Sequence, residues 1–593
     1  MSMATTSQAM GERMRTEDAE RTARSWIDGF HAAASGSDGS FVDELFVEDS
    51  WWRDILARSW DFETIRGVDA IGGAIGDGGL TNVRLDETAS PRLVESDAGE
   101  AFIEAIFLFD TTHGAGRGVV RLEILDGTWK ASTLFTTLQD LRGLEQRRGH
   151  RRPVRIPEVK GSALENWADW RRRTSDFEDS SPTVVIIGGG HNGLMTAAHL
   201  GFWGVDTLVI EKSPRIGDNW RNRYRSLVLH DAIWADHFPG MSFPDSWPVY
   251  MPKDKLADWL EFYASAMEIN VWAGAELEES SYDDATQRWT LTVRRSDGTF
   301  RTLSPTDVVI ATGVHGEPNT PEFAGREAFT GKVVHSSHYR GDEVGPGDRA
   351  VVVGAGNSAH DAAQNLHANG VGVTMLQRSS TYIVSQKSHY SQTIGKLYHE
   401  NGMPTEDADL VQASTPNLLA LERGVELTRR MADLDRDMLD GLERAGYRFD
   451  MGVGGAGVLS KILSGPGSYY LDVGCAELIA SGKVRLEHAE VRNFTANGVV
   501  LTDGTELDAE LVVLATGYKN MRETARRILG DDAADRCDPV WGMKADGEIS
   551  GMWRRSGHPG LWFQGGPLYM ARFYSRFLAL QLHGLKSGLM DRR

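Results

Sequence analysis

Two glycine-rich turns contain the residue types whose spacing most clearly indicates chemistry. The first, Gly188-Gly189-Gly190-His191-Asn192-Gly193, follows the apolar run Val184–Ile187 and precedes an apolar helical stretch, residues 194–202. In such a strand–turn–helix context the glycines permit a tight turn, and free N–H groups at the helix start favour a pyrophosphate. A second apolar run, residues 207–210, ends in Glu211, which can accept hydrogen bonds from both hydroxyls of a ribose. The pattern predicts a dinucleotide site.

The motif recurs at Gly354-Ala355-Gly356-Asn357-Ser358-Ala359, after the apolar run 350–353. From Gly188 to Glu211 is 23 residues (211 − 188), and the same step from Gly354 reaches the neutral Gln377, which Arg378 and two serines follow. An acid at this position would repel a 2′-phosphate, whereas a guanidinium can pair with one. We therefore expect FAD in the first site and NADPH in the second. The alternative for Arg378 is a solvated surface charge.

Two further apolar runs end in Ala-Thr-Gly and must lie close to these turns. Residues 307–310 precede Ala311-Thr312-Gly313, and residues 511–514 precede Ala515-Thr516-Gly517-Tyr518. Their order predicts an α/β fold with two nested Rossmann-like domains. The FAD-binding domain would begin at 181–340, give way to an NADPH-binding domain with a helical insertion at 341–498, and resume at 499–593. Near the end, Gly565-Gly566-Pro567 precedes a helical run, 571–584, whose N-terminus could face the flavin.

The first 148 residues read as a separate α+β unit, joined to the rest by a linker at 149–180. Helical periodicity at 17–33 is followed by strand patterns at 100–109, 118–125 and 128–138. The pattern Phe46-x-x-x-Ser50-Trp51-Trp52-Arg53-Asp54 resembles the nuclear-transport-factor-like (SnoaL-like) cone. We interpret it as an accessory domain that packs against the enzyme; a second binding site in its pocket is the alternative.

Composition excludes several classes of function. The formal charge of −21 over 593 residues argues against binding to nucleic acid or to an anionic membrane. The two cysteines, Cys475 and Cys537, form no Cys-x-x-Cys, so neither a redox dithiol nor a thiolate metal site is expected. The polar opening, residues 1–24, predicts no secretory signal, and we expect a cytoplasmic protein with no metal. Self-association into a homo-oligomer is left open.

The segment between the two sites carries a family resemblance. Phe329, Gly331, His335, Tyr339 and Arg340 match all five specified positions of the flavin-containing monooxygenase fingerprint FxGxxxHxxx(Y/F)(K/R). The Baeyer–Villiger fingerprint of type I enzymes requires Trp at the Tyr339 position. From about residue 181 to the end, the chain therefore resembles class B flavoprotein monooxygenases, and its N-terminal extension resembles their type II branch.

The resemblance implies an enzyme in which NADPH reduces FAD by hydride transfer, O₂ forms a peroxyflavin, and one oxygen atom is inserted into a small-molecule substrate. For type II members this implies Baeyer–Villiger oxidation of ketones, S- or N-oxygenation, and acceptance of NADH as well as NADPH. Two other classes stay open: an NADPH oxidase or reductase that oxygenates nothing, and a binding protein with a structural flavin. Substrate-dependent NADPH consumption without peroxide would argue against both.

The resemblance also assigns roles to individual residues. His335 is carried over as structural and coenzyme-positioning. The usual GGxW appears as Gly217-Asp218-Asn219-Trp220, and His230-Asp231 stands where many members have an asparagine beside the flavin. His230 could donate a hydrogen bond near the flavin, or be an ordinary packed histidine.

The candidate site residues are then as follows. The catalytic candidates are His230, Asn357 and His335. The cofactor-binding candidates are Gly188, Gly190, His191, Asn192, Gly193, Glu211, Lys212, Asn219, Trp220, His230, Asp231, Ala311, Thr312, Gly313, Gly354, Gly356, Asn357, Ser358, Ala359, Arg378, Ser379, Ala515, Thr516, Gly517 and Tyr518. Candidate pocket residues in the helical stretch 385–455 are Tyr390, Tyr398 and His399, and a cation to stabilise an oxyanion is not ranked among Lys387, His389 and Arg378.

Overall fold

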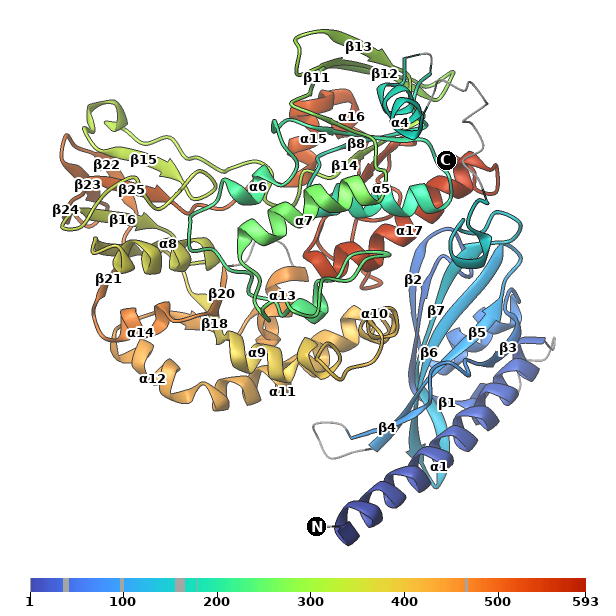
Figure 1. Ribbon diagram of the computed structural model, residues 1–593. Coiled ribbons are helices and arrows are strands. Elements are labelled where there is room, and N and C mark those ends of the chain that lie inside the picture. The colour runs from blue at the N-terminus through green and yellow to red at the C-terminus, as the bar shows by residue number, and fades with distance from the viewer. Residues whose placement is uncertain are drawn as a thin grey trace.

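The computed structural model describes residues 2–35, 42–95, 101–154, 166–178, 180–463 and 468–592. Figure 1 shows the N-terminal unit in blue beside a larger body, in which green and red segments surround one sheet and yellow-green and orange segments another. Of the expected linker, residues 155–165 and 179 lie outside the described residues, and helix α4 (Trp167–Asp176) lies within it. No helix in the described ranges has the length and apolar character needed to cross a bilayer.

The N-terminal unit packs helix α1 (Ser2–Ser35) against a mainly antiparallel sheet of order β2-β1-β7-β6-β5-β3, with β4 paired to β5. Asp126 and Gly127 have φ of 50° and 79°, the positive values of a type I′ turn, which joins β6 and β7 as a tight hairpin. The strands expected from residue 100 onward are confirmed as β5, β6 and β7. The elements are β1 (Phe46–Ile55), β2 (Phe62–Arg66), β3 (Thr81–Leu85), β4 (Arg92–Glu95), β5 (Ala101–Asp110), β6 (Gly114–Leu125), β7 (Thr128–Leu141), α2 (Val42–Leu45) and α3 (Val68–Gly76).

Aromatic side chains fill the core of this unit. Trp26 and Phe30 project from α1 with ring centroids 5.2 Å apart, and Phe30 meets Phe46 at 6.2 Å and Phe107 at 6.3 Å. All four side chains are buried. Aromatic burial of this kind accounts for most of what fixes a helix on a sheet.

A five-stranded parallel sheet of order β10-β9-β8-β14-β26 forms the first nucleotide-binding unit. Its strands β8 and β14 are buried at every residue and are apolar apart from Asp307 at the start of β14, as expected where helices cover both faces of a sheet. The elements are β8 (Val184–Ile187), α5 (His191–Phe202), β9 (Thr207–Glu211), α6 (Asp218–Arg221), α7 (Lys253–Ala266), β10 (Val271–Ala273), β14 (Asp307–Ile310), β26 (Leu561–Phe563) and α17 (Leu568–Lys586), with an antiparallel annex of β11 (Glu276–Asp283), β12 (Arg288–Arg294) and β13 (Phe300–Leu303).

A second parallel sheet, of order β15-β25-β16-β17-β21, forms the other nucleotide-binding unit. Its elements are β15 (Lys332–His335), β16 (Arg349–Val353), α8 (Asn357–Ala368), β17 (Gly372–Leu376), α14 (Cys475–Ala480), β21 (Val484–Glu487) and β25 (Leu511–Leu514), with an annex of β22 (Val491–Phe494), β23 (Gly498–Leu501) and β24 (Glu506–Asp508). Two α/β units are therefore nested as expected.

The expected borders of the second unit are wrong at both ends. Strand β15 precedes residue 341 and strand β25 follows residue 498, yet the two pair with each other, and β25 pairs with β16. The physical reason is that hydrogen-bonded neighbours in one sheet cannot belong to separate domains. The chain returns to the first sheet only at β26, after α15 (Met521–Leu529) and α16 (Asp531–Asp535).

The helical insertion lies between the second sheet and the N-terminal unit (Figure 1). It contains β18 (Thr381–Ser385), α9 (Gln386–Gln392), α10 (Thr405–Ala413), α11 (Asn417–Leu434), α12 (Arg436–Arg444), β19 (Phe449–Asp450), α13 (Gly457–Leu463) and β20 (Tyr469–Asp472). The run of helices expected from residue 385 is thereby confirmed.

A buried ion pair fixes the N-terminal unit to the body. Arg53 on β1 donates from Nε and Nη2 to the Glu548 carboxylate at 2.7 and 2.8 Å, and from Nη1 to the Ala413 carbonyl at 2.7 Å. The two charged side chains are 2% and 1% exposed. Because removing one partner of such a pair strands a buried charge, at a cost of about 3–5 kcal/mol, the unit is held in one orientation.

Candidate active site

The first glycine turn is built so tightly that only glycine fits at two positions. Gly188 has a φ of 115°, and a Cβ there would lie 2.6 Å from the Ala311 carbonyl oxygen. A Cβ on Gly193 would lie 2.0 Å from the Gly188 oxygen. Helix α5 begins at His191 immediately after extended Gly190, so its first N–H groups face the turn. This is a cradle that a pyrophosphate fits.

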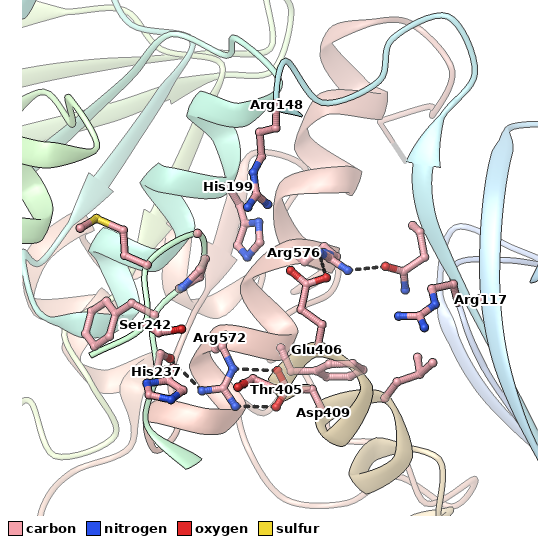
Figure 2. A pocket seen from close by; sticks show the side chains of 17 residues that line it. Arg117, Arg148, His199, His237, Ser242, Thr405, Glu406, Asp409, Arg572 and Arg576 are labelled. Carbon is pink, nitrogen blue, oxygen red and sulfur yellow. Dashed lines mark hydrogen bonds and ion pairs between the residues drawn. The ribbon is translucent and has the colours of Figure 1, made fainter. Parts of the chain in front are cut away.

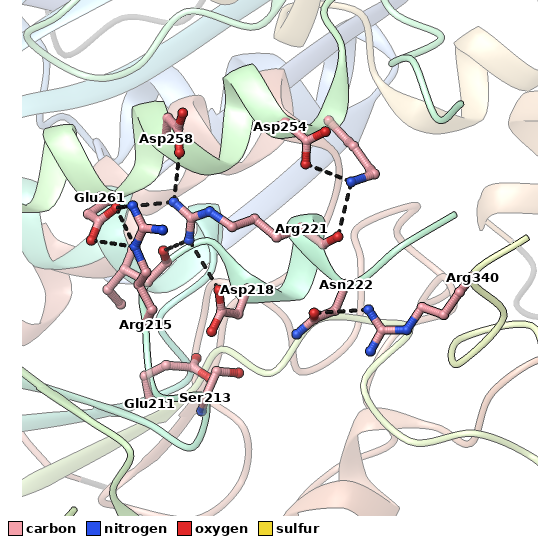
Figure 3. A network of polar contacts seen from close by, with 12 residues as sticks. Glu211, Ser213, Arg215, Asp218, Arg221, Asn222, Asp254, Asp258, Glu261 and Arg340 are labelled. Atoms are coloured by element: carbon pink, nitrogen blue, oxygen red, sulfur yellow. Dashed lines mark hydrogen bonds and ion pairs between the residues drawn. The ribbon is translucent and has the colours of Figure 1, made fainter. Parts of the chain in front are cut away.

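The carboxylate of Glu211 stands at the end of β9, beside this turn (Figure 3). It accepts hydrogen bonds from the Gly189 and Ser213 main-chain N–H groups, both at 2.7 Å. The nearby Arg215 and Arg221 pair instead with Glu261, at 2.6 and 3.1 Å. Among the described residues Glu211 has no ion-pair partner, so its remaining lone pairs suit ribose hydroxyls.

The start of α17 closes the first site from the opposite side. The Gly566 carbonyl accepts from His191 Nε2 at 3.0 Å and from Asn192 Nδ2 at 3.2 Å, and helix α17 begins after Pro567. The predicted helix start is confirmed. The start of α17 therefore lies against the first glycine turn.

Several buried polar atoms here have no protein partner within the described ranges. They are Trp220 Nε1, Thr312 Oγ1 and Ser336 Oγ. Buried donors and acceptors are nearly always satisfied in folded proteins. Two of the three belong to segments predicted to touch cofactor, so these orphans fit a polar ligand in the nucleotide sites. Ala311 and Gly313 flank Thr312 at the end of β14, and Lys212 and Asn219, which follow β9, are exposed.

The second turn repeats the geometry of the first. Gly354 has a φ of 130°, and a Cβ there would lie 2.4 Å from the Ala515 carbonyl oxygen. Helix α8 begins at Asn357 after extended Gly356, and Ala359 is buried at its first turn. The Asn357 side-chain oxygen accepts from the Leu471 N–H at 3.0 Å, which ties α8 to strand β20. The residues around this turn fit a second dinucleotide.

The strand end beside the second turn is open. The Arg378 side chain is 76% exposed and lies 3.9 Å from Glu490. Gln377, in contrast, is fully buried and exchanges hydrogen bonds with the main chain of Arg448. A long exposed ion pair is worth little, so the guanidinium is free to bind a phosphate. Ser379 is exposed beside it.

The fingerprint segment joins the two units. Tyr339 donates its hydroxyl to Asn365 on α8 at 2.7 Å, and Arg340 donates to Asn222 of the first unit at 2.9 Å. His335 accepts at Nδ1 from the Ser337 N–H, so its Nε2 carries the proton and donates to the Gly517 carbonyl at 3.0 Å. Burial is the main reason that the pKa of His335 is lowered.

Tyr518 links the two Ala-Thr-Gly segments. Its ring lies 5.2 Å from that of His335 and 4.9 Å from that of His315, which follows β14. Thr516 Oγ1 donates to the Asn319 carbonyl at 2.5 Å, and the Asn319 N–H donates to Gly517 at 3.0 Å. Both strand ends therefore meet at one junction.

His230 and Asp231 lie on the chain between α6 and α7, and the His230 side chain faces α8. His230 Nε2 is 3.8 Å from the Asp361 carboxylate, one helical turn after Asn357. Burial raises the pKa of Asp361, an effect that the neighbouring His230 opposes. Burial likewise raises the pKa of Asp231.

Three residues near Asp231 were not predicted. Asp236 is 1% exposed and neither carboxylate oxygen has a partner among the described residues; burial, then Asp231, raises its pKa well above the ordinary value. Tyr569, in the first turn of α17, has its pKa raised by burial and by Asp231 and Tyr469. Arg572 lies one turn further along. No repeating motif marks these residues, although Tyr569 follows the predicted helix start closely.

Two of the predicted pocket residues form hydrogen bonds within the protein. Tyr398 donates its hydroxyl to Asp409 at 2.7 Å, and Tyr390 donates to the Tyr398 carbonyl at 2.5 Å. His389 is surrounded by protein, which lowers its pKa to about 4, so it is not a cation at neutral pH. His399 is exposed. In the described ranges no group of three or more His, Cys, Asp or Glu side chains is arranged for a metal ion.

Comparison with known proteins identifies a matching family model and sequence relatives of this chain. A family model described as pyridine nucleotide-disulphide oxidoreductase matches residues 185–403, a span without either cysteine. Indole-3-pyruvate monooxygenase YUCCA1 of Oryza sativa subsp. japonica is 30% identical over 352 residues, 59% of this chain and 80% of the relative. Probable indole-3-pyruvate monooxygenase YUCCA9 of Arabidopsis thaliana is 31% identical over 339 residues, 57% and 75% of the two chains.

Solved structures with a similar fold include two flavoenzymes. A flavin-containing monooxygenase from Stenotrophomonas maltophilia is 18% identical with a TM-score of 0.45, over 69% of this chain and 99% of its own. A cyclohexanone monooxygenase bound to epsilon-caprolactone is 17% identical with a TM-score of 0.49, over 69% and 88%.

The sequence relatives, the two glycine cradles and the fingerprint that joins them agree on one family, including its use of FAD and NADPH. The chain belongs to the class B flavin monooxygenases, the flavin-containing monooxygenase family.

Proposed function

We propose that this monooxygenase carries out a Baeyer–Villiger oxidation of a ketone, with S- or N-oxygenation as a lesser activity. In the balanced reaction, ketone, O₂, NADPH and a proton give an ester or lactone, NADP⁺ and water. One oxygen atom enters between the carbonyl carbon and its neighbour as their C–C bond breaks. The other leaves as water with the two electrons of NADPH. When bound, reduced FAD supplies the activation of O₂.

The observation that supports a carbonyl substrate is a group of carboxyl and phenol side chains gathered around Asp231. It consists of Asp231, Asp236, Tyr469 and Tyr569, which come from the segment after α6, strand β20 and the start of α17. Burial raises the pKa of each, which favours the protonated, neutral form of these groups. Oxygen attack on a ketone places negative charge on the carbonyl oxygen. Fixed donors in a site without water stabilise that charge.

Arg572 positions this group without binding the substrate. Its Nε and Nη2 donate to Asp409 at 2.7 and 2.5 Å, and its Nη1 donates to the Ala235 and His237 carbonyls at 2.6 and 2.7 Å. All three nitrogens therefore have partners in the protein. The guanidinium fixes the segment that carries Asp236, and its charge lowers the pKa of that acid against the larger effect of burial.

The sequence relatives support the same substrate class. Both are named for indole-3-pyruvate, a 2-oxo acid, whose reactive centre is also a carbonyl carbon. In the second unit, Arg378, Ser379 and the start of α8 would hold NADPH, and His335 would fix the strand end beside it.

The test is a balance of NADPH, O₂, peroxide and product with FAD-loaded enzyme and a panel of cyclic ketones, 2-oxo acids, sulfides and tertiary amines. We expect ester or lactone in proportion to NADPH. Sulfoxide or N-oxide alone would overturn the ketone assignment, and stoichiometric peroxide with every substrate would indicate an oxidase.

A pair of variants tests the donor group itself. Asp236→Ala removes a donor and should lower ester formation by about ten- to a hundredfold, with more peroxide released. Asp236→Asn keeps an N–H donor of the same size and is the matched control. Rates of ester formation equal to that of the wild type in both variants would show that Asp236 has no role in the reaction.

A further inference from the structure

A cavity of about 250 Å³ lies where the N-terminal unit, helix α10 and helices α5 and α17 meet (Figure 2). Its wall includes Arg117 of β6, Arg148, His199 of α5, Glu406 of α10 and Arg576 of α17. In Figure 2 Arg148, His199 and Arg576 face the same space. None of these five residues belongs to the nucleotide turns, the fingerprint or the donor group described above, although Arg572 and Asp409, which position the donor group, form part of the same wall.

The charge in this cavity is predominantly positive. Four guanidinium groups and two carboxylates line it. Asp409 is matched by Arg572 at 2.5 Å, and Glu406 lies 3.6 Å from Arg576. Arg117 forms ion pairs with Asp86 and Asp407, both at 2.8 Å, and neither of these acids lines the cavity.

Of these four guanidinium groups, that of Arg148 has no ion-pair partner among the described residues. No carboxylate of the described residues lies within 4.0 Å of it, and it stacks over the Phe202 ring at 4.3 Å. A planar guanidinium held flat against an aromatic face keeps its N–H edge available. Its edge is therefore a donor without an anion.

His199 supplies a second, independent indication of a ligand. Its side chain is 3% exposed and lines the cavity, and neither ring nitrogen makes a hydrogen bond of normal geometry with the described residues, although the Arg572 main chain lies close enough to raise its pKa slightly. Burial, then Arg576 and Arg148, lowers its pKa well below the ordinary value. A neutral imidazole always has one N–H to donate. Leaving a buried donor unpaired costs about 1–3 kcal/mol, which a bound acceptor would recover.

Five apolar residues form part of the remaining wall, beside the polar side chains of Gln139, His237, Ser242 and Thr405, and they favour an organic ligand over a bare inorganic anion. The five are Phe238, Pro239, Met241, Leu410 and Phe573. The volume, about 250 Å³, is below the ~300–1,000 Å³ of sites for drug-sized ligands, so the ligand must be small. Apolar walls stabilise an organic body, whereas phosphate or sulfate would leave them without contact.

We propose that this cavity binds a small organic carboxylate, with its two oxygens between Arg148, Arg576 and His199 and its apolar body against the remaining wall. The site lies at the seam that the N-terminal unit completes through Arg117 and Gln139. It gives that unit a ligand-binding role separate from the oxygenation reaction.

Titration calorimetry with the FAD-loaded full chain tests this, using benzoate and hexanoate, neutral benzamide, and inorganic phosphate. We expect saturable binding of a carboxylate and none of benzamide or phosphate. Benzoate should also leave the flavin absorbance unchanged, because the cavity does not include the nucleotide turns. Binding of phosphate as tight as that of benzoate, equal binding of benzamide, a carboxylate-induced flavin shift, or no binding of either carboxylate would each overturn the proposal.

Arg148→Gln locates the site. It removes one charge-assisted contact and should weaken carboxylate binding about tenfold or more. Arg147→Gln is the matched control. The Arg147 guanidinium lies against Gly204 and is not part of the cavity wall. Equal affinity in both variants would contradict the assignment even if a carboxylate binds elsewhere on the chain.

Discussion

The two nucleotide turns share one geometry and differ at the strand end beside them. In each, a glycine with positive φ packs against the carbonyl of an alanine in an Ala-Thr-Gly segment: Gly188 against Ala311, and Gly354 against Ala515. The first turn ends at Glu211, which two main-chain N–H groups hold in place. The second ends at Arg378, which is 76% exposed.

This difference matches the two ligands. A fixed acid, held by two main-chain N–H groups, suits FAD, which stays bound through many turnovers. An exposed, flexible cation suits NADPH, which must enter and leave as a phosphorylated nucleotide. We expect the turn to bind a dinucleotide and the residue at the strand end to select which one.

The largest expected effect comes from filling the first turn. Gly193→Ala places a methyl group 2.0 Å from the Gly188 carbonyl oxygen. Overpacking of about 1–3 kcal/mol should lower FAD affinity by roughly ten- to a hundredfold. Flavin content per chain, from absorbance, measures this. Gly201→Ala, in the same helix but with open space at its Cβ, should keep its FAD. Equal loss in both would mean that the helix, and not the turn, was disturbed.

Filling the second turn should separate the two sites. Gly354→Ala meets the Ala515 oxygen at 2.4 Å and demands a φ of 130° from an alanine. Backbone strain of ~1–3 kcal/mol should raise the KM for NADPH about tenfold while FAD stays bound. Steady-state kinetics and flavin content give both values. Gly372→Ala in the same sheet, where the nearest atom is 3.7 Å away, is the control. Loss of FAD from Gly354→Ala would refute the assignment of the two sites.

A smaller effect is expected at the strand end. Arg378→Gln should raise the KM for NADPH about fivefold, since an exposed ion pair contributes roughly 1 kcal/mol, and should leave the KM for NADH unchanged. Arg378→Lys keeps the charge and should lie between. If both coenzymes respond alike, Arg378 contacts no 2′-phosphate and is a solvated surface charge.

The smallest effect concerns pH at the junction. The folded pKa of His335 lies below its unfolded value, so its contribution to stability is complete above the unfolded pKa, near 6.5, and is lost as pH falls through the folded pKa. Denaturant unfolding at pH 7.5 and pH 5 should show a smaller acid-induced loss of stability in His335→Gln than in the wild type. An identical loss would show that other groups account for the acid sensitivity.

Sequence reasoning located both turns, both Ala-Thr-Gly strands and the fingerprint, because each is a local pattern in which glycine, apolar runs and a strand end follow one another. It also predicted helix α17, which follows Gly566 and Pro567. It failed on the borders of the second unit, since nothing within residues 332–335 shows that this strand pairs with β25, almost 180 residues later. It also missed Asp236, Tyr569 and Arg572 for the same reason.

The sequence by itself indicated the family, the two dinucleotides and the turns expected to hold them, since steric limits on glycine and the charge at a strand end act within a few residues. Only the tertiary structure decided which strands share a sheet, that Asp236 is buried without a partner among the described residues, and that Arg148, His199 and Arg576 face one cavity. Those properties depend on burial and on contacts between distant segments, which no local pattern encodes.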